Sequence, residues 1–106
     1  MADEPAKIWK QERLGSTDDL QVSILTLAPG QEVPWHDHSY VSDLFVGVTG
    51  TTRIETREPD AVIELAPGET HEVPVKQPHR VTSVAGTASY VLVQGGGRYD
   101  YNPIEG

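Results

Sequence analysis

The sequence predicts an all-β protein in which two antiparallel sheets pack as a jelly-roll barrel. Short runs of aliphatic and β-branched residues recur along the chain, and Pro or Gly interrupts them about every eight to twelve residues. No segment shows a sustained helical period with a capping residue. The turn Leu-Ala-Pro-Gly occurs at 27–30 and again at 65–68, each time followed shortly by Glu-Val-Pro. Two similar turns in a small β-protein favour two related halves, as in a jelly roll built from two Greek keys.

Six runs have the composition of strands, and turn residues end most of them. We expect strands at residues 21–28, 40–48, 51–57, 61–65, 79–84 and 89–93. The first stops at Pro29-Gly30 and the second at Thr49-Gly50. The third breaks at Pro59, the fourth ends at Pro67-Gly68, and Gly86 lies between the last two.

The length of 106 residues predicts a single domain with one modest core. Hydrophobic residues make up 37% of the chain, which suffices for strands that each bury one face. We expect residues 1–6 to form a disordered lead-in and residues 7–106 to form one barrel domain.

The composition argues against several classes of partner. The formal net charge is −8, and the eight Lys and Arg residues are scattered, so neither nucleic acid nor an anionic membrane is an expected partner. No stretch has the length of a membrane span and no signal peptide opens the chain, which favours a cytoplasmic location. The chain has no cysteine, which excludes disulfides, thiolate ligands and cysteine nucleophiles.

His36 and His38 are the strongest functional signal in the sequence. Alternate residues of a strand face the same side, so the two imidazoles form half of a transition-metal site. Asp43 and His79 offer a third and a fourth ligand. Three histidines and a carboxylate suit a divalent ion of Fe, Mn, Ni, Zn or Cu and leave positions for exchangeable ligands. The alternative is a pair of surface histidines in a polar turn.

The spacing around these residues resembles the two sequence motifs of the cupin family. The first motif has Gly, five residues, His-x-His, three or four residues, an acid, six residues and Gly, and it is matched here by Gly30, His36, His38, Asp43 and Gly50. The second has Gly, five residues, Pro-x-Gly, two residues, His, three residues and Asn, and its positions hold Gly68, Pro74, Lys76, His79 and Ser83. The motifs and the segment between them cover about half of the chain. The resemblance implies a small single-domain cupin with the double-stranded β-helix fold.

Three positions depart from the family pattern. Asp43 stands where the family has Glu, and its shorter side chain binds the metal either directly or through water. Lys76 replaces Gly, which implies that the turn before His79 does not need a positive φ. Ser83 replaces Asn and changes the hydrogen bonding at the end of the strand. The resemblance implies four metal ligands: His36, His38, Asp43 and His79.

In cupins the ligands point into a small barrel, and strand alternation then selects the residues of the substrate pocket. Phe45 shares the inward face with Asp43, and Val81 and Ser83 share it with His79. Trp35 is a candidate for the wall of the pocket mouth, with a core or dimer-interface aromatic as the alternative.

Two residues are candidates for a catalytic role. His71 has the parity of Val73, which favours the barrel-facing side, and an imidazole beside the metal can act as acid or base. A structural histidine is the alternative. Asp43 is the other candidate. No organic cofactor is expected.

A homodimer is expected, because a small barrel has open sheet edges and a limited core. Leu44, Val46 and Val48 lie on the outward face of their strand and offer a surface for an outer sheet or a partner. The tail from Arg98 to Tyr101, released by the glycines at 95–97, is a candidate to lie across the partner subunit.

The metal site predicts an enzyme that converts a small organic molecule at a divalent ion with open coordination positions. The small cupins that this chain resembles include dioxygenases, isomerases and lyases, and we favour oxygenase-type chemistry, although the fold does not choose the reaction. One alternative is a non-catalytic barrel that binds a metabolite or a metal. Another is a metal-free barrel whose His and acid groups carry out dehydration or sugar isomerisation directly.

Overall fold

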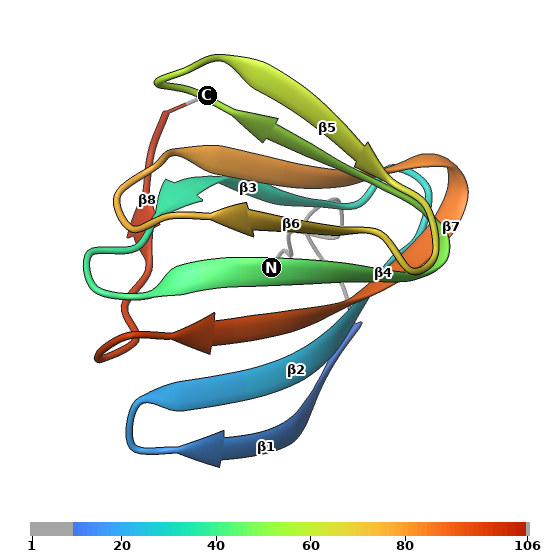
Figure 1. Cartoon of the computed structure of the whole chain (residues 1–106). Coiled ribbons are helices and arrows are strands. Elements are labelled where there is room, and N and C mark those ends of the chain that lie inside the picture. The colour runs from blue at the N-terminus through green and yellow to red at the C-terminus, as the bar shows by residue number, and fades with distance from the viewer. Residues whose placement is uncertain (1–9, 106) are drawn as a thin grey trace, which may run out of the picture.

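Two long antiparallel strands organise the computed structural model, which describes residues 10–105. β4 (Ser42–Thr56) pairs with β7 (His79–Gly95) from end to end. The register shifts between Gly47 and Thr51, where the two-stranded ribbon bends over on itself (Figure 1). Each strand therefore has two halves that belong to different layers of the molecule.

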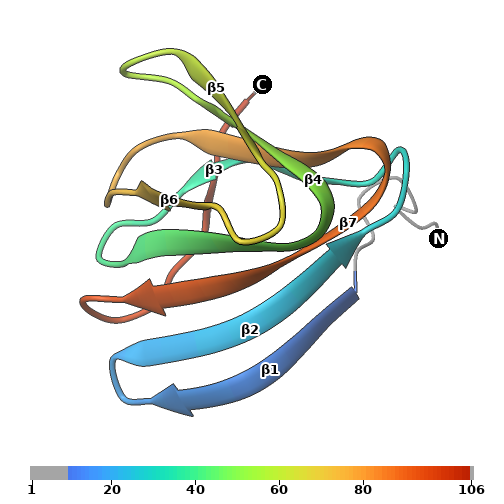
Figure 2. The same ribbon diagram turned by 45° about the vertical axis from the view of Figure 1, so that its right-hand side comes forward.

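The remaining strands extend these two layers, and every pairing is antiparallel. One layer has the order β1–β2–β7–β4–β6 and contains β1 (Lys10–Thr17), β2 (Leu20–Leu27) and β6 (Thr70–Val73). The other has the order β8–β3–β7–β4–β5 and contains β3 (Glu32–Asp37), β5 (Ala61–Leu65) and β8 (Asn102–Pro103). Figure 2 shows the two layers curving toward each other around a common interior. The predicted all-β jelly-roll barrel is confirmed.

Two pairs of predicted strands are single strands in the structure. The runs at 40–48 and 51–57 are the two halves of β4, and those at 79–84 and 89–93 are the two halves of β7. Gly50 has a φ of 65° and bends β4 without ending it. Ala85 and Gly86, both with positive φ, lie at the matching bend of β7. The turn residues were correctly located, but they mark bends in continuous strands.

The hydrophobic core fills the space between the two layers. Strand alternation brings one side chain in two from each strand to this interior. The buried cluster consists of Leu25, Leu27, Val33, Phe45, Ile54, Leu65, Val73, Val81, Tyr90 and Leu92. At one end of the barrel, polar residues occupy the space between the layers in place of this apolar cluster. The predicted lead-in at residues 1–6 lies outside the described residues, and within 10–105 no helix has the length and hydropathy to cross a membrane.

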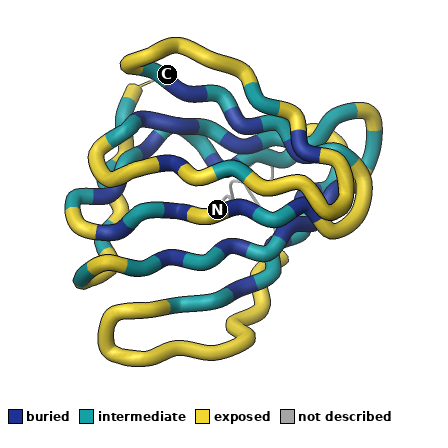
Figure 3. The backbone as a smooth tube through the Cα atoms, in the orientation of Figure 1, coloured by how far each residue is buried: buried dark blue, intermediate teal, exposed yellow. Residues whose placement is uncertain are grey.

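The outer surface of the first layer carries exposed apolar side chains. Every residue of β1 is exposed, which leaves this strand as an open edge of the sheet (Figure 3). Leu14 is 59% exposed, and Leu44 and Val48 lie on the outward face of β4 as predicted. Open edges and exposed apolar residues favour association.

The homodimer stays a prediction that these surfaces make testable. At micromolar concentration we expect sedimentation to give a mass near twice the 11.6 kDa of the chain. Replacing Leu44 with Glu should lower that mass, because a buried unpaired charge destabilises an interface. A wild-type mass near 11.6 kDa would contradict the prediction.

Candidate metal centre

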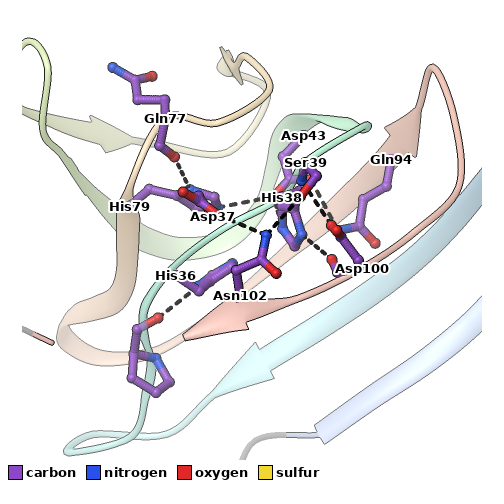
Figure 4. Close-up of polar contacts among 11 residues, drawn as sticks. His36, Asp37, His38, Ser39, Asp43, Gln77, His79, Gln94, Asp100 and Asn102 are labelled. Carbon is purple, nitrogen blue, oxygen red and sulfur yellow. Dashed lines mark hydrogen bonds and ion pairs between the residues drawn. The ribbon is translucent and has the colours of Figure 1, made fainter. Parts of the chain in front are cut away.

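Four polar side chains meet at one end of the barrel, between the two layers. His36 lies on β3 and His38 directly follows it, while Asp43 and His79 stand near the starts of β4 and β7. One ligand atom of each lies within 4.8 Å of those of the others, and all four residues are buried. Figure 4 shows the three imidazoles and the carboxylate around a common centre. The predicted metal-binding residues are therefore brought together.

Backbone carbonyls fix the orientation of all three imidazoles. Nδ1 of His36 contacts the carbonyl oxygen of Pro34 at 2.7 Å, and Nδ1 of His79 contacts that of Gln77 at 2.9 Å. Nδ1 of His38 contacts the carbonyl oxygen of Asp100. A carbonyl oxygen only accepts hydrogen bonds, so each Nδ1 carries the hydrogen. In the neutral tautomer, Nε2 then offers its lone pair for coordination.

Asp43 faces two of these nitrogens across the gap between the layers. Its Oδ2 lies 3.1 Å from Nε2 of His79 and 3.2 Å from Nε2 of His38. Its Oδ1 accepts a hydrogen bond of 3.0 Å from the side-chain amide of Gln94. Nε2 of His38 is buried and has no well-directed hydrogen bond. Lone pairs of nitrogen and a carboxylate oxygen repel one another unless a proton or a metal ion lies between them. The donor set therefore fits a divalent transition ion.

The acid–base behaviour of the cluster follows from its burial and its charges. Burial opposes ionisation of Asp43, but contacts with His38 and His79 outweigh it and hold the pKa of this carboxyl well below its usual range. Burial also opposes protonation of His38, yet the carboxylate of Asp43 and the Asp100 carbonyl raise its pKa above 6.5. Burial and the nearby His79 lower the pKa of His36 to about 4. These shifts favour protonation of His38, beside Asp43, over protonation of His36.

A cavity opens onto the cluster, and two of the predicted pocket residues line it. Phe45 and Val81 contribute apolar walls beside the four polar residues. The cavity has a volume of about 50 Å³, which is room for a few water molecules. Its described lining residues include no Lys or Arg. The polar end of the cavity thus adjoins an apolar wall.

Sequence reasoning missed several residues of this cavity. Gln94 and Tyr90 reach it from β7, and Tyr99 and Tyr101 reach it from the C-terminal segment. In the structure this segment lies over the cavity of its own chain. Its contact with a partner subunit stays a prediction. The alternation of Tyr99 and Tyr101 was a signal that both rings face one side.

Three predicted site residues lie away from the cavity. Trp35 alternates with His36 and so faces the opposite side of β3, where the guanidinium of Arg57 lies 3.9 Å from its ring centre. Ser83 and His71 lie on the inward faces of their strands, but further along those strands than the cluster. At about 3.3 Å a residue, Ser83 stands about 13 Å from His79, and His71 stands about 7 Å from Val73, which pairs with Asp43. His71 pairs with Phe45 and is half-buried. Neither residue lines the described cavity.

The prediction for Lys76 is wrong. The residue has a φ of 67°, so the turn before His79 does adopt the left-handed conformation that Gly would provide without strain. The backbone N–H of Lys76 donates a 2.7 Å hydrogen bond to the carbonyl oxygen of His38. This bond ties the two histidine-bearing segments together and holds Lys76 in the unfavourable conformation.

Comparisons with known proteins agree with this geometry. Residues 23–95, more than half of the chain, match the sequence model described as a cupin domain. A protein with a double-stranded β-helix domain from Klebsiella pneumoniae is 19% identical with a TM-score of 0.81, and the match covers 99% of this chain and 90% of that chain. None of the curated proteins matches the sequence.

Two further solved structures resemble the barrel. The DMSP lyases RdDddP and RnDddQII give a match that is 21% identical with a TM-score of 0.79, covering 92% of this chain and 53% of that chain. KdgF from Halomonas sp. is 17% identical with a TM-score of 0.75, and the match covers 92% of this chain and 86% of that chain. Identities at this level show a shared fold and no more.

The pKa values predict how metal affinity depends on pH. A metal ion must displace the proton held between His38 and Asp43, so zinc affinity should fall as the pH drops through the raised pKa of His38. His36 should contribute no further loss until about pH 4. Calorimetric titration with zinc should show more protons released for each ion bound at pH 5 than at pH 8. Affinity that is constant over this range would contradict the assignment.

Proposed function

The chain belongs to the cupin family, and from this premise we propose that it binds one divalent transition-metal ion and converts a small organic molecule there. The ligands in this proposal are His36, His38, Asp43 and His79. The supporting observation is the convergence of one ring nitrogen from each of three histidines and one carboxylate oxygen within 4.8 Å in a buried setting. In a chain without cysteine, such a set suits Fe, Mn, Ni, Zn or Cu and leaves coordination positions open.

In this proposal, some residues bind the metal and others hold those ligands in position. Gln94 holds Oδ1 of Asp43, so Oδ2 is the oxygen turned toward the histidines. The carbonyl contacts at Nδ1 keep each ring in a single tautomer and orientation. A bound divalent ion would act as a Lewis acid that polarises an oxygen atom of the substrate. Preorganised ligands of this kind favour catalysis, because they need no rearrangement during the reaction.

The cavity limits the substrate to a small molecule with an oxygen-bearing end and an apolar part. The oxygen-bearing end would approach the metal ligands, and the apolar part would lie against Phe45 and Val81. These walls exclude water and thereby strengthen electrostatic interactions inside the cavity. The rings of Tyr99 and Tyr101, 42% and 37% exposed, stand at the cavity rim and would contact the substrate first.

Oxygenase-type chemistry is our first candidate, and lyase or isomerase chemistry is the second. Open positions on a metal with a His-rich ligand set allow substrate and dioxygen to bind together. We name the second candidate because the DMSP lyases show that this fold also carries lyase chemistry, although the shared fold itself does not choose the reaction. Iron-, manganese-, nickel-, copper- and zinc-loaded protein should therefore be tested with small diketones and catechols, with oxygen uptake and product formation recorded in air and under argon.

The outcomes of this assay separate the functions. Metal-dependent oxygen uptake supports the oxygenase, and product formed equally under argon supports the lyase or isomerase. Turnover that persists in protein stripped by a chelator favours direct His and carboxylate catalysis. Tight binding of a metabolite without turnover favours the non-catalytic barrel.

The metal assignment predicts the effect of removing two ligands. The double variant His36→Ala/His38→Ala should lose stoichiometric metal, because two ligands cannot hold a divalent ion against a chelator. His71→Ala is the matched control, since it removes a histidine of the same barrel that lies outside the cluster. Elemental analysis of tag-free protein measures both. An undiminished metal content in the double variant would contradict the assignment of His36 and His38 as metal ligands.

A further inference from the structure

We propose that residues 99–104, the C-terminal strap, close over the cavity and set the orientation of His38, so that strap docking and metal binding strengthen each other. The inference rests on the metal site proposed above. It assigns a role to a segment that lies outside both sequence motifs and beyond the residues matched by the family model. The strap passes across the open end of the barrel beside β3 (Figure 1).

The strap is attached to β3, the strand that carries His36 and directly precedes His38. β8 pairs with β3, with Pro103 opposite His36 and Asn102 opposite Asp37. The backbone N–H of Ile104 donates a 3.0 Å hydrogen bond to the carbonyl oxygen of Trp35. The strap therefore continues the sheet at the edge where His36 and His38 emerge.

Two polar side chains of the strap hold the loop that follows β3. Oδ1 of Asp100 accepts a 2.8 Å hydrogen bond from the backbone N–H of Ser39. The side-chain amide of Asn102 donates to Oδ1 of Asp37 and to Oγ of Ser39, each at 3.0 Å. Asp37 and Ser39, the two residues held by these bonds, directly precede and follow His38 in the chain (Figure 4).

His38 depends on the strap in a way that the other histidines do not. His36 and His79 each contact a carbonyl two residues earlier in their own segment. The carbonyl that contacts His38 belongs to Asp100, which is 62 residues away in sequence. Detaching the strap would thus leave two histidines oriented and free the third to change its rotamer.

The strap also supplies the aromatic rim of the cavity. The ring of Tyr101 stacks on His36 with centroids 4.5 Å apart and planes at 17°. The ring of Tyr99 lies with its centroid 5.4 Å from that of His38. Because both tyrosines line the cavity, movement of the strap would widen the entrance at the same time as it frees His38.

The strap is able to detach without unfolding the barrel. No residue of the strap belongs to the described core cluster, and its anchors are mainly exposed or half-buried polar groups. The glycines at 95–97 precede it, and Gly96 has a φ of 108°. Segments with few apolar contacts open at low free-energy cost. Metal binding and strap docking are thermodynamically linked. The free energy by which the docked strap strengthens metal binding therefore equals the free energy by which the metal stabilises the docked strap.

Hydrogen exchange on the wild-type protein tests this coupling without any variant. Zinc should slow exchange of the Ser39 and Ile104 amides, whose acceptors lie across the strap contact. The Gly68 amide, bonded to the carbonyl oxygen of Gly47 away from the cluster, is the internal control. Equal exchange of the Ser39 and Ile104 amides with and without bound zinc would overturn the proposal.

A double variant tests the same coupling from the side of the metal. Asp100→Ala/Asn102→Ala removes three side-chain hydrogen bonds between the strap and residues 37–39. We expect zinc affinity to fall about ten- to a hundredfold, as for other groups that orient a ligand, with faster release of zinc to a chelator. Arg53→Ala/Glu64→Ala, which removes an exposed ion pair on β4 and β5, is the matched control and should bind like wild type.

The outcomes separate this proposal from the one on which it rests. Wild-type protein that binds no zinc, manganese, iron, nickel or copper would reject the metal site itself. Wild-type protein that binds zinc, with the strap variant binding equally tightly and releasing it equally slowly, would reject the strap proposal alone. If the strap variant does not fold, the exchange measurement on wild-type protein decides the matter.

Discussion

The contact of Asp43 with His38 and His79 across the two layers is the constraint on which the rest of the site depends. A buried carboxylate requires compensation, and the described residues that line the cavity include no Lys or Arg to provide it. Compensation must come from a proton or a metal ion held between Oδ2 and the Nε2 atoms. The barrel supplies the geometry for this: β4 brings the carboxylate from one layer, and β3 and β7 bring the imidazoles from the other.

The supports of the cluster come from backbone rather than from charged side chains. Carbonyl oxygens at Pro34, Gln77 and Asp100 contact the three Nδ1 atoms. Those of Pro34 and Gln77 lie two residues from the histidines that they contact, whereas that of Asp100 belongs to the strap. The Lys76 turn, with its unfavourable φ, adds a bond to the His38 carbonyl. Of the three histidines, His38 is the one whose carbonyl partner lies in a distant segment, which links the strap to the metal centre.

The sequence predicts the barrel and the four clustered residues because both follow from local patterns. Strand alternation and motif spacing determine which side chains face inward. They do not determine how far along a strand the cavity extends, which is why Phe45 and Val81 line it and Ser83 does not. Four strands were missed, β1, β3, β6 and β8, and none of them has a long aliphatic run. All residues of β1 are exposed, and β8 is two residues long. The strap was beyond prediction, because its partners lie some sixty residues earlier in the chain.

X-ray absorption at the metal edge of tag-free protein loaded with one zinc equivalent tests the central claim most directly. The proposed centre predicts about three nitrogen scatterers with imidazole outer-shell features at roughly 2.0–2.1 Å, together with one or more oxygens at roughly 2.0–2.2 Å. The His36→Ala/His38→Ala variant should lose those imidazole features. A wild-type spectrum of oxygen ligands alone, unchanged by the double substitution, would contradict the account.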